Sequence, residues 1–236
     1  MSTTIVSAFI GNSNNYRSTS VYLELGKHLL DVHLPKIIFL ETCIIEEYKH
    51  LINPMTKLVP FEKHELLFSC DNHVTLPSGC NTQKDTKEYL QVMCNKTNWV
   101  NVAIQLNPFK SSQFVWVDFG LFHVFDSNLV RFQQSFNSLQ NYDLDKVHIA
   151  RIWNLDTTNN IDMFNYPLWF FAGGVFGGSS SALQRFHSLF VGEIQNLLNE
   201  NKITWEINIW FMIYKNNQDL FDPYYGSHDE SILEGY

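Results

Sequence analysis

The sequence has no cluster of Lys and Arg, and this absence excludes one broad class of partner. Its 16 Lys and Arg stand against 24 Asp and Glu, which gives a formal net charge of −8. Because binding to nucleic acid needs clustered positive side chains, a general nucleic-acid surface is excluded. A small ligand that carries phosphate needs only local positive charge, backbone N–H groups or a metal ion, so such a ligand is still possible.

The sequence also lacks paired cysteine motifs and long apolar runs. Cys43, Cys70, Cys80 and Cys94 show neither a CxxC pair nor the histidine spacing of a zinc finger, so we interpret them as reduced thiols. The first apolar run is too short for a signal peptide, and no segment reaches the roughly 18 unbroken apolar residues that span a bilayer. We therefore expect a cytoplasmic protein without a transmembrane segment.

The composition and the residue patterns of the chain predict one globular α/β domain over residues 1–236. The chain is 45% hydrophobic, enough for a sizeable core. Apolar and β-branched runs that read as strands alternate with helical patterns, which is typical of βαβ units. We expect a mostly parallel, twisted sheet with helices on both faces and ligands at the carboxyl ends of the strands. The expected strands include 4–11, 36–42, 64–70 and 114–117, and the expected helices include 18–30, 43–52 and most of 86–109.

Asp118 directly follows the buried run "FVWV", at the end of a predicted strand. This position suits a ligand-binding carboxylate, but Asp is also common in turns, so the two interpretations are balanced. The triplet "DFG" matches a kinase motif, yet the chain has neither a kinase Gly-rich loop nor "HRD", which excludes a kinase.

A glycine-rich stretch, "AGGVFGGSSSALQRF", comes before a strongly amphipathic segment. Ser181 and Gln184 form a capping-box pattern at the start of the predicted helix. The paired glycines fit either a tight structural corner or a backbone that packs closely against a ligand.

Acidic residues in two later segments are candidates for chemistry. Glu206 lies among aromatic residues in "TWEINIW", where a charged side chain costs free energy unless it is paired or belongs to a site. The tail "YYGSHDESILEGY" holds His228, Asp229 and Glu230 in a row. It is either a solvated charge run or a segment folded back onto a site.

Taken in order, "FVWVDFG", "FFAGGVFGGSSSALQRF", "WEINIW" and "HDESIL" resemble the WlaTC/HtrL glycosyltransferase family, which has the GT-A fold. More distantly, "GGVFGGS" and "HDESILEGY" resemble segments of the retaining galactosyl and N-acetylgalactosaminyl transferases of the blood-group type. The resemblance covers most of the chain. It implies a GT-A-like fold and a hexosyl- or N-acetylhexosaminyltransferase.

The resemblance also implies roles for individual residues. Asp118 matches the first carboxylate of an Asp-x-Asp motif, and Gly120 stands in the second position. Asp229 would bind the donor sugar and Glu230 would face its anomeric carbon, while a competing alignment gives Glu206 the catalytic place.

A divalent ion, Mn²⁺ or Mg²⁺, is the cofactor that the resemblance implies. Asp118 would hold it, and His228 or Asp126 would replace the missing second Asp. Arg17 is a candidate for the phosphates. The full expected donor and nucleotide set is Ala8, Phe9, Arg17, Asp118, Gly120, Gly173, Gly174 and Asp229.

The function expected on these grounds is transfer of a sugar from a nucleotide-sugar such as a UDP-sugar to a hydroxyl of a glycan, lipid or protein. Retention is the outcome that the resemblance to the blood-group-type enzymes implies. The alternative is a catalytically silent module that binds carbohydrate or nucleotide, which the missing second Asp favours. The two functions differ in turnover, because only the enzyme converts its substrate.

Overall fold

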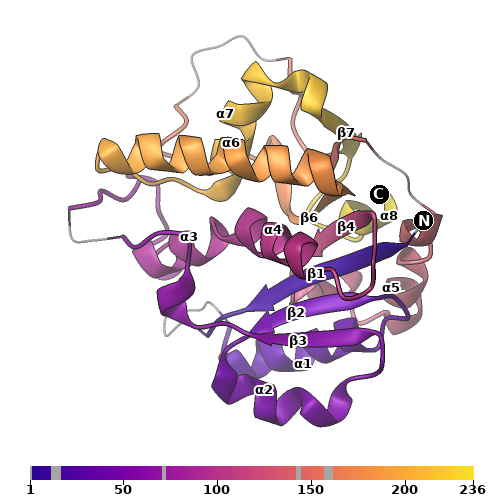
Figure 1. Cartoon of the computed structure of the whole chain (residues 1–236). Helices are drawn as coiled ribbons and strands as arrows, with labels where there is room; N and C mark the ends of the chain where they lie inside the picture. The colour runs from indigo at the N-terminus through magenta and orange to yellow at the C-terminus, as the bar shows by residue number, and fades with distance from the viewer. Residues whose placement is uncertain (1, 12–16, 71–72, 142–144, 157–161) are drawn as a thin grey trace.

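The structure is a computed structural model that describes residues 2–11, 17–70, 73–141, 145–156 and 162–236 (Figure 1). Its strands are β1 (Thr3–Phe9), β2 (Lys36–Leu40), β3 (Thr56–Pro60), β4 (Gln113–Val117), β5 (Val147–Arg151), β6 (Phe171–Ser179) and β7 (Phe221–Tyr225). Its α-helices are α1 (Thr19–Leu30), α2 (Thr42–Tyr48), α3 (Lys87–Met93), α4 (Lys96–Leu106), α5 (Leu129–Ser135), α6 (Ser180–Asn199), α7 (Glu206–Asn216) and α8 (Ser231–Glu234). Short 3-10 helices are η1 (Lys49–Leu51), η2 (Lys63–Glu65), η3 (Leu121–Phe125), η4 (Ser138–Asn141) and η5 (Gln218–Leu220).

The strands form one sheet in the order β3-β2-β1-β4-β6-β5-β7. Strand β6 runs antiparallel to both of its neighbours, β4 and β5, and every other pair is parallel. Because the parallel strands end at the same edge, the side chains that follow β1 and β4 are brought together there. The start of the antiparallel β6 reaches the same edge, which adds its first residues to those of the parallel strands.

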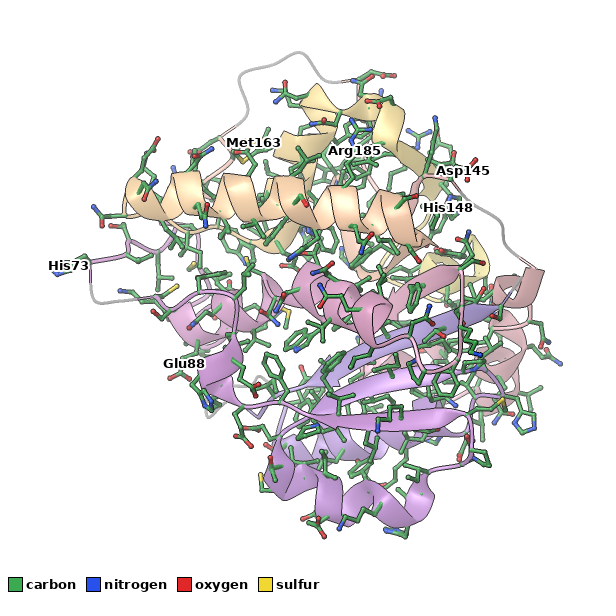
Figure 2. The ribbon with its side chains drawn as sticks, viewed as in Figure 1. His73, Glu88, Asp145, His148, Met163 and Arg185 are labelled. Carbon is green, nitrogen blue, oxygen red and sulfur yellow. The ribbon has the colours of Figure 1, made fainter. Side chains whose placement is uncertain are left out.

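Successive side chains of each strand point to opposite faces of the sheet, which divides the interior into two cores. In β4, Phe114 and Trp116 pack into the core under α3, α4, α6 and α7, whereas Val115 and Val117 pack into the core with α1, α2, α5 and α8. Both faces are apolar because helices cover both, as is usual for a largely parallel sheet. Figure 2 shows side chains filling the space between these helices and the sheet. The expected α/β class, with a mostly parallel sheet and helices on both faces, is confirmed.

Three local expectations were wrong. Residues 64–70 were expected to form a strand, but this stretch holds only the end of η2 and irregular chain, and the strand β3 lies earlier. The tight structural corner, one of the two interpretations of the glycine pairs, is wrong, because the glycines lie inside β6, where they belong to the ladder with β4. Helix α6 is capped by the Ser179 side chain, which accepts a hydrogen bond from the Ala182 amide, and not by Ser181.

No helix among the described residues combines the length and the apolar character that a bilayer crossing requires.

Candidate functional site

A cavity of about 560 Å³ opens at the carboxyl ends of β1 and β4. The start of β6 and the N-terminus of α7 form its inner side, and residues just before α3 and β6 form the outer side. Most of the residues singled out from the sequence line it. They are Ala8, Phe9, Arg17, Asp118, Gly120, Gly173, Gly174, Glu206 and His228.

A buried lysine organises the inner side of this cavity. The Lys96 ammonium lies 3.1 Å from Oδ1 of Asp118 and 3.0 Å from Oε1 of Glu206, and it donates to the Gly173 carbonyl at 2.9 Å. Its side chain is 3% exposed, that of Glu206 is 8% exposed, and that of Asp118 is 38% exposed towards the cavity. One cation therefore joins α4, β4, β6 and α7 at a single point.

The protonation of Lys96 follows from its two partners. Burial by itself lowers the pKa of this amine, but the charges of Asp118 and Glu206 and their hydrogen bonds outweigh it, so the pKa lies above its ordinary value. Because the pKa of Lys96 is higher in the folded protein than in the unfolded chain, its charge stabilises the fold. This stabilisation is fully present below the ordinary lysine pKa of about 10.4 and is lost as pH rises through the pKa of Lys96 in the folded protein. At neutral pH the cavity therefore holds a fixed positive charge.

Asp118 is placed by the end of β4, as its position after "FVWV" suggested. Its carboxylate accepts a hydrogen bond from the Trp116 indole at 2.7 Å, and its amide donates to the Gly174 carbonyl at 2.9 Å. The first contact fixes the side chain and the second fixes the backbone. The remaining exposure of the carboxylate faces the cavity, where a ligand can reach it.

Glycine is required where β6 passes this cluster. A Cβ at Gly173 would come within 2.7 Å of Glu206 Oε1 and 3.3 Å of Lys96 Nζ, and one at Gly174 would come within 2.9 Å of Ile232. Of the two interpretations of the glycine pairs, close approach applies here. The surface approached is the ion cluster and the C-terminal segment of the chain.

Of the three ionisable residues His228, Asp229 and Glu230 in the C-terminal segment, only His228 lines the cavity. His228 lines the cavity, with its ring edge-on to Trp169 at 4.1 Å between centroids. Asp229 instead accepts hydrogen bonds within its own turn from Ser231, and Glu230 forms an ion pair with Arg131. Neither Asp229 nor Glu230 lines the cavity, although Ile232 two residues later does.

Asp126 also lies outside this lining. It sits in the left-handed conformation, with φ of 46°, at the end of η3. His123, on the same short helix, does line the cavity, and its ring contacts the Gly120 carbonyl at 2.7 Å.

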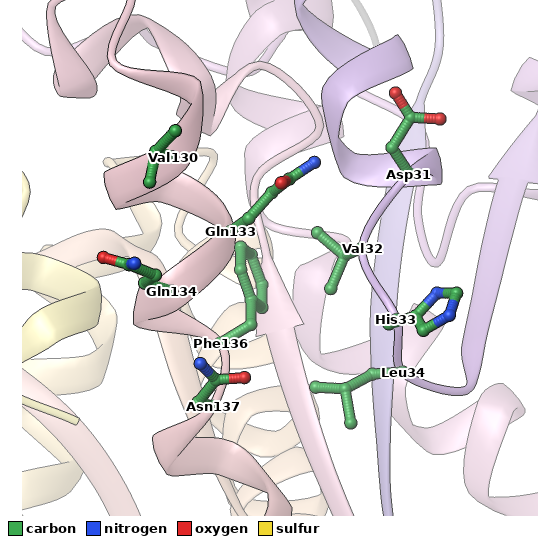
Figure 3. A pocket seen from close by; sticks show the side chains of 9 residues that line it. All are labelled: Asp31, Val32, His33, Leu34, Val130, Gln133, Gln134, Phe136 and Asn137. Carbon is green, nitrogen blue, oxygen red and sulfur yellow. The ribbon is translucent and has the colours of Figure 1, made fainter.

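A second, smaller cavity of about 420 Å³ lies between the end of α1 and α5 (Figure 3). Its charged or titratable members are Asp31 and His33, and the remainder are apolar or amide side chains. It contains none of the residues singled out from the sequence and no lysine–carboxylate cluster, so the first cavity is the candidate site.

Comparison with known proteins places this chain in a family. The model of a family described as "Bacterial protein of unknown function (HtrL_YibB)" matches residues 46–230, well over half of the chain. This chain belongs to the HtrL/YibB family. Protein HtrL of Escherichia coli strain K12 is 28% identical over 142 residues, which cover 58% of this chain and 48% of that protein. The chain therefore spans about half the length of the curated relative that it matches.

Solved structures similar to this HtrL/YibB chain include two transferases. Apo mouse xyloside xylosyltransferase 1 aligns with a TM-score of 0.46 at 14% identity, covering 94% of this chain and 85% of that one. A glycosyltransferase involved in glycosylation of the major capsid of PBCV-1 aligns with a TM-score of 0.49 at 12% identity, covering 95% and 82%.

The sequence interpretation missed Lys96, the central residue of the site in this HtrL/YibB chain. A signal for it exists, because Lys96 shares the spacing of Trp99, Val100 and Ala103, all of which are buried on one face of α4. A lysine on the core face of a helix needs a buried partner, since an unpaired charge there is costly.

We expect Lys96→Met to destabilise the protein by about 3 kcal/mol or more, because the substitution leaves Glu206 as an uncompensated buried charge. The control is Lys27→Met, which breaks an exposed pair with Glu24 and should cost less than about 1 kcal/mol. Urea unfolding of both variants at pH 7 measures the difference. Equal losses in the two variants would contradict the role given to Lys96.

Proposed function

We propose that this protein is a glycosyltransferase of the GT-A type that transfers a sugar from a nucleotide-sugar, such as a UDP-sugar, to a hydroxyl of an acceptor. The observation that carries the proposal is the cluster of Asp118, Lys96 and Glu206 in a glycine-lined cavity at the carboxyl ends of β1 and β4. Ligands of open α/β sheets bind at this edge. The motif order described above supports the same assignment.

The nucleotide would lie near the end of β1. Phe9 and Tyr22 line that side with ring centroids 5.5 Å apart, which offers an aromatic surface to a base. Arg17 lines the same cavity and supplies a positive charge for the diphosphate. A cavity with aromatic walls and a few fixed polar groups is typical of small-ligand sites.

Glu206 is the residue that we assign to the reacting centre. Glycosyl transfer passes through an oxocarbenium-like state, which a carboxylate close to the anomeric carbon stabilises. Glu206 lines the cavity and is held by Lys96, so it needs little reorganisation during the reaction. Glu230, the other sequence candidate, is engaged by Arg131 outside the cavity lining.

The divalent ion implied by the resemblance would be held by Asp118 and His228. Partial burial lowers the pKa of His228, in spite of the opposing charge of Asp229, so its ring is neutral at pH 7 and can accept a metal. The described residues contain no group of three or more metal-binding side chains, so oxygens of the diphosphate would complete the set. An imidazole ligand favours Mn²⁺ over Mg²⁺, which prefers oxygen. Such an ion would offset the charge of the leaving diphosphate.

The competing function is a silent module that binds a nucleotide or a sugar. Gly120 in the second position of the Asp-x-Asp motif favours it, because one carboxylate ligand is missing there. Both functions predict nucleotide binding. Only the transferase predicts release of UDP from a UDP-sugar.

We expect Glu206→Gln to lower the rate of UDP release from a UDP-sugar by about a hundredfold or more, because it removes the negative charge at the reacting centre. Glu230→Gln is the matched control, because it makes the same substitution at the carboxylate that pairs with Arg131. Its rate of UDP release should stay within about threefold of the wild-type rate. Melting curves establish that both variants are folded. If Glu230→Gln lost UDP release while Glu206→Gln kept the wild-type rate, the catalytic residue would lie in the C-terminal tail instead.

We expect Mn²⁺ to tighten UDP binding to the wild type about tenfold or more, and His228→Ala to remove most of this gain. His228→Ala leaves the Lys96 cluster intact, so a loss reports on the metal and not on the fold. His33→Ala, at an exposed site in the second cavity, is the control. Calorimetry with Mn²⁺ and with EDTA is the measurement, and equal UDP affinity under both conditions would exclude the metal.

A further inference from the structure

Two loops form an outer wall of the candidate cavity that the donor does not account for. We call the segments 78–85 and 162–169 the outer wall. The Gly79 amide donates to the Asn165 carbonyl at 2.8 Å, and the Ser78 hydroxyl donates to the Asn165 side chain at 2.8 Å. These bonds fasten the loop before α3 to the loop before β6. Members of both loops line the cavity, among them Asn81, Asp85, Pro167 and Trp169.

Asp85 is the feature of this wall that indicates a ligand. The residue is only 7% exposed, yet it lines the cavity. Its Oδ2 accepts a hydrogen bond from the Asn81 amide at 2.9 Å. No Lys, Arg or His of the described part of the chain forms an ion pair with it, in contrast to Asp118 and Glu206. A carboxylate that lines a cavity and has no cationic partner can accept a hydrogen bond from a ligand.

Tyr89 adds a hydroxyl to the same region. It lies in the first turn of α3, four residues after Asp85, and it lines the cavity. Burial, reinforced by the charges of Glu206, Asp118 and Asp85, raises the pKa of its phenol, so the hydroxyl keeps its proton and can donate.

Trp169 supplies an apolar surface beside these polar groups. Its side chain is partly exposed and lines the cavity, held edge-on by His228. A pyranose ring has an apolar face of C–H groups and a rim of hydroxyls. An aromatic surface next to one acceptor and one donor matches both parts of such a ring.

We propose that Asp85, Tyr89 and Trp169 form a binding site for the acceptor, and that this acceptor is a pyranoside sugar. This inference rests on the proposed transferase function. The donor has its own groups at the strand ends and at Glu206, and the outer wall faces the cavity from the loops instead. Asp85 accepts a hydrogen bond from an acceptor hydroxyl, Tyr89 donates one to a sugar oxygen, and Trp169 packs against the ring.

The test measures acceptor use by Asp85→Asn and Tyr89→Phe. UDP release from UDP-glucose, UDP-galactose, UDP-N-acetylglucosamine and UDP-xylose is followed with and without methyl α- and β-pyranosides as acceptors. Asp85→Asn keeps an oxygen for the Asn81 amide but removes the charge, and Tyr89→Phe removes only the hydroxyl. Each should raise the KM for the pyranoside about tenfold or more, with a smaller change in the KM for the donor.

Glu88→Gln is the matched control, because it removes one negative charge from the exposed side of α3, where Figure 2 labels the residue. It should leave the pyranoside KM as in the wild type. Unchanged pyranoside KM values in both Asp85→Asn and Tyr89→Phe would overturn the proposal. An equal rise in the KM for the donor would overturn it as well, since the wall would then bind the donor sugar.

The transferase function and the acceptor site fail in distinguishable ways. If the wild type releases no UDP from any donor, the proposed function is wrong. Saturation-transfer NMR with the same methyl pyranosides then tests sugar binding at the outer wall independently of turnover. Contact with a pyranoside in the wild type that is lost in Asp85→Asn would still support a sugar site. Absence of contact in the wild type would overturn it.

Discussion

The Lys96 ammonium is the contact on which the candidate site depends. It is buried at the first position of α4, where the helix dipole is unfavourable to a positive charge, so its stability there comes from Asp118 and Glu206. Glu206 is the first residue of α7, where the dipole favours a negative charge. The ion cluster thus ties two helix starts to the end of β4. A charge held this way cannot relax easily when a ligand enters, which is what electrostatic preorganisation requires.

Strand β6 explains why so tight a cluster can form. Gly173 gives its carbonyl to Lys96 and leaves no Cβ between the strand and Glu206. Further along, Gly177 has no room for a Cβ beside the Tyr236 hydroxyl and the Phe114 carbonyl. The glycines therefore let one strand pass between the ion cluster and the packed end of the chain. Their cost in backbone entropy is offset by the contacts they permit.

Some of this could be predicted from the sequence. The α/β class followed from strand and helix alternation, and Asp118 was placed correctly at the strand end because "FVWV" is apolar on both faces of β4. The corner interpretation of the glycine pairs was wrong, since the local preference of glycine for turns says nothing of the ladders with β4 and β5.

The composition of the site itself was harder to predict. Lys96 pairs with residues 22 and 110 positions away, a proximity that only the fold creates. In the tail, three ionisable residues stand side by side, and spacing could not show that His228 faces the cavity while Glu230 turns to Arg131. Asp85 and Tyr89 gave no local sign, because only the fold shows that both residues line the cavity.

The most direct measurement of the central claim is the titration of Lys96 by NMR of its side-chain nitrogen, assigned by comparison with Lys96→Met. The account predicts that this ammonium still carries its proton at a pH where exposed lysines have lost half of theirs, because Asp118 and Glu206 hold it. A Lys96 resonance that titrates below the exposed lysines would mean that burial dominates, and it would contradict the charge cluster on which the site is built.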